Sequence, residues 1–287
     1  MNRAVRLFLL LAAALSLAAC GRFASMGAAL AYKNAATLLT WTVDDYVGLT
    51  TPQKASVRDM IAHEVYWHRD HELPVYRRFL ASVADRSQRP YTQAEVQQGW
   101  DEVRGDYRRE VERLLPPASK FLATLDEQQL ARLERKLLDD EEKFEKEMTK
   151  GNAEERRTRS LKKTLRVVED WTGRLSSSQR AIVSAREDDV APMLEQRFGE
   201  RRYRATETLT LVRTRDAARI ERGLHRLLLE EKSWRLPDYQ AALDRRDQAS
   251  INMIVQLSAT LSAEQRAHLQ QRLQGYIQDI NDLGAPA

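Results

Sequence analysis

Apolar side chains recur every three or four residues along most of this 287-residue sequence, as in Val96, Trp100, Val103, Tyr107 and Val111. An α-helix turns once in 3.6 residues, so this spacing gathers apolar side chains on one helix face. The alternation of apolar and polar residues that is typical of strands never continues for more than four residues. The pattern therefore predicts an all-α fold.

The composition supports successive helices with short connections. Leu outnumbers Val and Ile together, and only 11 Gly and 8 Pro interrupt the chain. Leu keeps more rotamer freedom in a helix than the β-branched residues do. We expect one elongated multi-helix bundle over residues 29–283, and a division into two pseudo-repeated halves, 49–150 and 175–283, is left open.

Prolines set several expected helix ends, because proline lacks the N–H that a helix interior needs. Pro74 is expected to kink or split a helix over 51–84, and Pro116 and Pro117 are expected to end the next one. Residues 203–233 are expected to form one long helix. The tryptophans lie beside apolar stripes and are expected to anchor the core. They are Trp41, Trp67, Trp100, Trp171 and Trp234.

The first twenty residues have the order of a secretory signal. Arg3 and Arg6 precede an apolar stretch, 7–17, that is too short to span a membrane. The stretch ends in Leu17-Ala18-Ala19-Cys20. This ending resembles the bacterial lipobox, where a signal peptide is cleaved and a cysteine is acylated.

We predict that residues 1–19 are removed, that Cys20 carries a lipid anchor and that residues 20–28 form a tether. Gly21 stands where an inner-membrane retention signal would place Asp. By this resemblance the protein is sorted to the outer membrane and faces the periplasm. The alternative for Cys20, the only cysteine, is a buried free thiol.

Four segments share a pattern of Leu, then Thr, Ser or Asp, two further residues, and Gln. The second residue can serve as a helix N-cap, and the Gln can return a hydrogen bond to the cap's backbone N–H. The simplest interpretation is that four capping boxes start helices. The capping pairs are Thr50 and Gln53, Asp126 and Gln129, Ser176 and Gln179, and Ser262 and Gln265.

This pattern also resembles the Leu-Thr-x-x-Gln motif of the Spy/CpxP family, which are all-helical periplasmic chaperones and stress regulators with two motifs per chain. Here the motifs fall in two pairs, which begin at Leu49 and Leu125 and at Leu175 and Leu261. The resemblance implies a chaperone-like protein that binds clients. Homology and simple helix capping both remain open as its cause.

A second resemblance rests on the segment 41–53, which contains Trp-Thr-Val-Asp-Asp-Tyr-Val-Gly-Leu-Thr and a final Gln. It is similar to a family of uncharacterised proteobacterial lipoproteins with a lipobox and an all-helical remainder. The resemblance implies an outer-membrane lipoprotein and carries over no activity and no catalytic residue.

Glu64, His68 and His71 are expected on one helix face because they are spaced by four and three residues. Imidazole and carboxylate groups at this spacing can hold zinc or copper. The alternative is an ordinary polar surface. The leading interpretation includes no metal and no other cofactor.

A stripe of arginines lies on the helix expected over 203–233. The net charge of +4 is too small to indicate nucleic-acid binding, but a stripe could hold phosphates of lipopolysaccharide or an acidic protein client. The alternative is pairing with the charged segment 126–170, which is expected to form a solvated helical hairpin. The stripe consists of Arg215, Arg219, Arg222 and Arg226.

Asp44 and Asp45 could do acid–base work in an envelope hydrolase, although a network at a helix end is the preferred interpretation. The motifs of nucleophilic serine hydrolases, phosphate-binding Gly-rich loops and paired cysteines are missing from the sequence. The leading interpretation is a non-enzymatic lipoprotein that acts by binding. A carboxylate-based hydrolase and a metal-binding lipoprotein are the alternatives.

Overall fold

The computed structural model describes residues 31–189 and 193–284, so the predicted signal peptide, Cys20 and the tether lie outside the described residues. In the described part, ten α-helices and one 3-10 helix follow one another without a strand, which confirms the all-α multi-helix class. The helices are α3 (Ala35–Val47), α4 (Thr51–Arg86), α5 (Gln93–Leu122), α6 (Glu127–Thr149), α7 (Ala153–Thr172), α8 (Ser177–Asp189), α9 (Leu194–Arg213), α10 (Ala217–Leu229), η2 (Glu231–Ser233), α11 (Pro237–Thr260) and α12 (Ala263–Gly284).

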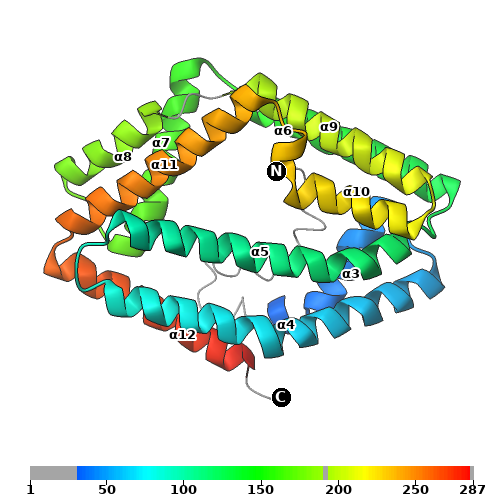
Figure 1. The fold of residues 1–287 in the computed structure, drawn as a ribbon, viewed down its shortest axis with the longest axis horizontal. Coiled ribbons are helices and arrows are strands. Elements are labelled where there is room, and N and C mark those ends of the chain that lie inside the picture. Colours follow the sequence, from blue (N-terminus) through cyan, green and yellow to red (C-terminus); the bar gives the residue numbers. More distant parts are fainter. Residues whose placement is uncertain (1–30, 190–192, 285–287) are drawn as a thin grey trace.

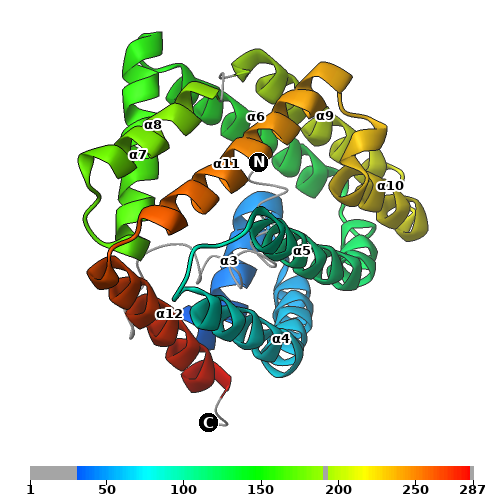
Figure 2. The same cartoon turned by 60° about the vertical axis from the view of Figure 1, so that its left-hand side comes forward.

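The helices run along the sides of a four-sided outline (Figure 1). One group contains α4, α5 and α12, a second contains α6, α9 and α10, and a third contains α7, α8 and α11. Figure 2 shows α11 running from the side of α9 to the start of α12. Segments far apart in the sequence therefore meet, because α12 packs on α4 and α10 packs on α5.

The largest apolar core lies between α3, α4, α6 and α9. Ile61 of α4, Leu137 of α6 and Val212 of α9 are completely buried there. A second core joins α5 to α10 through Val111 and Ile220, which are also completely buried. Since α9 and α10 complete cores that α3–α6 begin, the first of the two sequence halves does not enclose a core of its own.

Two helices continue through prolines, of which Pro74 was expected to kink or split one helix and Pro116 and Pro117 to end the next. α4 is not split at Pro74, and α5 does not end at Pro116 and Pro117. Proline in a helix interior costs stability through its missing N–H and its clash with the preceding turn. However, Leu115 and Ala118 on either side of the proline pair are buried. Burial of this turn against other helices outweighs the local penalty.

The single long helix expected over 203–233 is wrong, because the chain turns between α9 and α10. Arg215 adopts a left-handed conformation with φ 54° in this turn. Asp216 then caps α10, and its side chain accepts a hydrogen bond from the Arg219 backbone N–H at 3.0 Å. No Gly or Pro marks the turn, so helical periodicity alone does not detect it.

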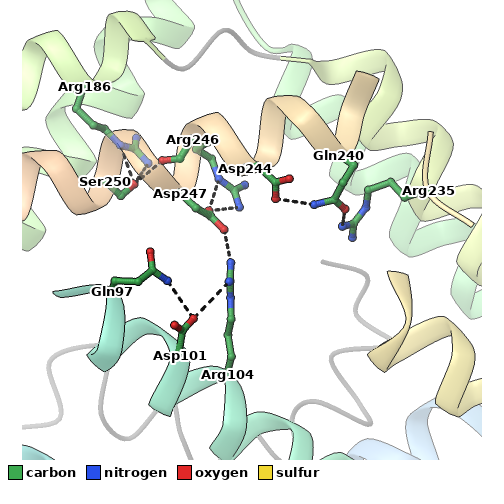
Figure 3. A network of polar contacts seen from close by, with 10 residues as sticks. All are labelled: Gln97, Asp101, Arg104, Arg186, Arg235, Gln240, Asp244, Arg246, Asp247 and Ser250. Atoms are coloured by element: carbon green, nitrogen blue, oxygen red, sulfur yellow. Dashed lines mark hydrogen bonds and ion pairs between the residues drawn. The ribbon is translucent and has the colours of Figure 1, made fainter. Parts of the chain in front are cut away.

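Polar side chains tie α11 to two other helices (Figure 3). Arg104 on α5 forms an ion pair of 2.7 Å with Asp247 on α11. Arg186 on α8 donates to the Ser250 hydroxyl of α11 at 3.1 Å. α11 therefore connects the α7–α8 group to α5.

The tryptophans do not all anchor the core. Trp171 stacks on Tyr276 of α12 with ring centroids 5.2 Å apart, and Trp67, Trp100 and Trp234 are also partly buried. Trp41, by contrast, lies on the outer face of α3 and is 64% exposed. The expectation of a core position is wrong for Trp41, because α4 and α6 pack on other sides of α3.

Candidate functional site

The four motifs with a terminal Gln start α4, α6, α8 and α12. At the first, Thr50 Oγ1 accepts from the Gln53 backbone N–H at 3.4 Å, and Gln53 Oε1 accepts from the Thr50 N–H at 3.0 Å. The same two bonds form at the other three motifs. These are the bonds that the capping interpretation predicts.

The same glutamines also bind one another in two pairs, which helix capping alone does not predict. The side-chain amides of Gln53 and Gln129 exchange hydrogen bonds of 3.2 and 2.7 Å. Those of Gln179 and Gln265 exchange bonds of 2.8 and 2.9 Å. We call these contacts the Gln53–Gln129 junction and the Gln179–Gln265 junction. Each joins the starts of two helices that lie far apart in the sequence.

Gln129 shows how completely a junction uses the amide group. Its NH₂ group donates to Gln53 and to the Gly48 carbonyl at 3.1 Å. Its oxygen accepts from Gln53 and from the Asp126 backbone N–H. Since an amide has two donors and two acceptor sites, nothing in this buried side chain is left for a ligand. The junctions are therefore structural.

Asp44 and Asp45 each have a separate lysine partner near the end of α3. Asp44 pairs with Lys54 at 2.8 Å and accepts from the Leu49 backbone N–H at 2.7 Å. The hydrogen bond from Lys54 is the main cause of the lowered pKa of Asp44. Asp45 pairs with Lys136 at 2.7 Å. These contacts fit a helix-end network and disfavour the acid catalysis that a hydrolase would need.

Glu64, His68 and His71 lie on one side of α4, but packing separates them. Glu64 and His68 are buried, and Glu64 accepts from Arg113 Nε at 2.6 Å. His71 is exposed and stacks on Trp67 with ring centroids 4.9 Å apart. Within the ranges that the structure describes, no three His, Cys, Asp or Glu side chains are grouped to hold a metal ion.

His68 instead belongs to a buried polar cluster that sequence reasoning missed. Its Nδ1 lies 3.0 Å from the Tyr32 hydroxyl, and its Nε2 lies 3.4 Å from Glu110 Oε1 on α5. The Tyr76 hydroxyl donates to the same carboxylate. Burial raises the pKa of both Tyr32 and Tyr76, so their hydroxyls stay protonated at neutral pH. We call these four residues the His68 cluster.

A cavity beside α4 is not lined by the His68 cluster. It has a volume of about 380 Å³ and lies between α4 and the end of α12, where Arg69, Leu73 and Ile280 are among its lining residues. None of the four cluster residues lines it. A substrate in this cavity would not contact the cluster, whose hydrogen bonds hold α4 against α5. The sequence gives no signal for the His68 cluster, because helical periodicity does not show which polar side chains become buried.

Arginines on α9 and in the turn that follows it pair with α6. Arg201 donates to the buried carboxylate of Glu141 at 2.6 and 3.1 Å, and Arg215 pairs with Glu127 at 2.6 Å. Arg215 thus has the internal partner that the alternative interpretation expected. The solvated hairpin over 126–170 is wrong, because α6 packs on α3 and α9 while α7 packs on α8 and α12.

Three arginines on α10 have no ion pair with any described residue. Arg219, Arg222 and Arg226 are exposed and lie three and four positions apart, opposite the side of α10 that packs on α5. We call them the α10 arginine face. The acidic residues at the two ends of the helix already have other partners. Asp216 caps the N-terminus of α10, and Glu230 lies 3.1 Å from the His225 ring. Guanidinium groups in this arrangement can bind phosphates or carboxylates.

Comparison with protein families shows which family the chain belongs to. A family model matches residues 45–240, which are 196 of the 287 residues and include the α10 arginine face. The chain belongs to the family of unknown function DUF6279. No curated protein and no solved structure shows a significant match. Among the helices that the structure describes, none is long and apolar enough to cross a membrane.

Proposed function

We propose that the protein is an outer-membrane lipoprotein, held through Cys20, that faces the periplasm and binds anionic groups of a partner with its α10 arginine face. The observation that carries this proposal is the contrast among neighbouring arginines. Arg201 and Arg215 are paired within the fold, whereas Arg219, Arg222 and Arg226 keep their guanidinium groups available. Exposed guanidinium groups on a rigid helix suit repeated contacts with carboxylates or phosphates.

The preferred partner is an acidic periplasmic protein client, and the phosphates of lipopolysaccharide offer the same chemistry. A chaperone-like role is supported by the way the motifs meet. The four motifs fall along the chain in two pairs, as two Spy-like halves with two motifs each would have them, and the members of each pair are in contact at the Gln53–Gln129 and Gln179–Gln265 junctions.

The test is a binding assay on the double variant Arg219→Glu with Arg222→Glu. The probes are a glutamate-rich unfolded peptide, lipid A and dephosphorylated lipid A. We expect the variant to lose about tenfold or more in affinity, since charge-assisted hydrogen bonds become repulsive. Binding of the unaltered protein should weaken as salt rises, because exposed charges are screened. The peptide and the two lipids show which partner supplies the anion.

The matched control is Lys162→Glu with Lys163→Glu on α7. These lysines are exposed and outside every ion pair of the described residues, and the change in net charge is the same. We expect this control to bind nearly as well as the unaltered protein, and both variants to keep their melting temperature. Equal losses in the two double variants, or no loss in either, would contradict a specific role for α10.

A further inference from the structure

We propose that the outer face of α3 rests in the membrane–water interface, with Trp41 and Leu38 placed among the lipid headgroups. The proposal rests on the lipid anchor at Cys20 and adds a second contact that orients the helical body. It concerns a different surface from the α10 arginine face. The occupant of the face is a lipid surface and not a protein.

The outer face of α3 exposes apolar side chains that the fold does not cover. Trp41 is 64% exposed and Leu38 is 42% exposed, and the two are three positions apart on one side of the helix. Leu39 and Tyr46 on the inner sides of α3 are buried against α4 and α6. Tryptophan is enriched at membrane interfaces because its ring is apolar and its N–H can still bond to polar groups.

The charges around this face do not oppose an anionic lipid surface. Asp44 is neutralised by Lys54, and Asp45 by Lys136. Lys33, near the start of the helix, is exposed and forms no ion pair with a described residue. A basic residue close to the membrane is attracted to anionic headgroups. The face is therefore apolar at Leu38 and Trp41 and basic towards Lys33, and its one carboxylate near Trp41, that of Asp45, is exposed but paired with Lys136.

The length of chain before α3 brings this face to the membrane. Ten residues lie between Cys20 and Ala31, the first described residue, and the eleven steps from Cα to Cα span at most about 40 Å. Trp41 lies ten positions further on, and the part of this distance that runs along α3, from Ala35, is about 9 Å. Two exposed apolar side chains bind a bilayer only weakly by themselves. A short tether keeps them at a high local concentration, so the weak contact becomes populated.

The experiment measures quenching of tryptophan fluorescence by lipids that carry bromine near the headgroup. The chain 20–287, which contains every described residue, is coupled through its only thiol, Cys20, to maleimide lipid in vesicles of phosphatidylethanolamine and phosphatidylglycerol. We expect brominated vesicles to quench the part of the fluorescence that comes from Trp41, one of five tryptophans. Trp41→Phe should lose this quenching. Trp234→Phe, which alters a partly buried tryptophan, should retain it.

Quenching that is equal in Trp41→Phe and the unaltered chain would overturn the proposal. Trp41 protected from iodide but not quenched by brominated lipid would also overturn it and would indicate a second copy of the chain on α3. Coupling through the thiol supplies the anchor in every sample, so the result does not depend on lipidation in the cell. Lipidation is measured separately, by the mass of the mature chain and by flotation of Cys20→Ala.

Discussion

At the scale of single residues, the glutamines of the two junctions combine two roles. Each accepts the backbone N–H of its own helix cap and also bonds to a glutamine at the start of another helix. Gln129 and Gln179 are buried. A buried polar group left without a partner costs more than an ordinary hydrogen bond contributes. The junctions should therefore contribute more to stability than capping alone.

Gln129→Leu tests this difference. The change leaves the Asp126 N–H, the Gly48 carbonyl and the Gln53 amide without their partner, so we expect a loss of about 2–3 kcal/mol in the free energy of unfolding. The control is Glu155→Leu on α7, where Glu155 is exposed and completes a capping box only, and about 1 kcal/mol or less should be lost. Urea unfolding at neutral pH measures both. Equal losses would show that the junction adds nothing to capping.

At the scale of helices, the hairpin of α9 and α10 depends on the close approach of two helices. Gly223 lies on α10 where a Cβ atom would overlap the side chain of Leu211 on α9. Glycine in a helix interior costs about 1 kcal/mol relative to alanine. Here the missing side chain allows the two helices to pack, and this packing positions the α10 arginine face.

Gly223→Ala should therefore destabilise the protein although alanine is the better helix former. Overpacking typically lowers the free energy of unfolding by about 1–3 kcal/mol. The higher helix propensity of alanine raises it by about 1 kcal/mol, so the net loss should be about 1 kcal/mol. Gly105→Ala is the matched control, because nothing lies within 4 Å of a Cβ there. That change should raise the melting temperature. If both changes stabilise the protein, the approach of α9 and α10 is not limited by this glycine.

At the scale of the whole molecule, the two sequence halves share the two largest apolar cores, whereas a smaller core lies between α7, α8 and α11. Leu209 and Val212 of α9 are buried with Ile61 and Leu137 from α4 and α6. Burying one such side chain contributes about 1.5–3 kcal/mol, and a domain is stable by only about 5–15 kcal/mol in total. The loss of a few of these contacts is enough to unfold either half. One cooperative body is the expected consequence.

Fragments 49–150 and 175–283 should each fail to unfold cooperatively when produced alone. Their helices would bury apolar faces incompletely, so we expect a gradual loss of circular dichroism in urea and poorly dispersed amide signals. In the intact chain, circular dichroism and tryptophan fluorescence should report one shared midpoint. A fragment whose midpoint matches that of the intact chain would show that the halves are independent domains.

The helical class and the four helix starts at capping boxes follow from the sequence alone, because periodicity and caps act through neighbouring residues. The sequence also named the arginines of α10. Three outcomes follow only from how the helices pack: Arg215 is paired while Arg219 is not, α5 continues through Pro116, and Trp41 stays exposed. Each of these outcomes depends on whether a residue far away in the chain packs against the position, and local preferences carry no information about such contacts.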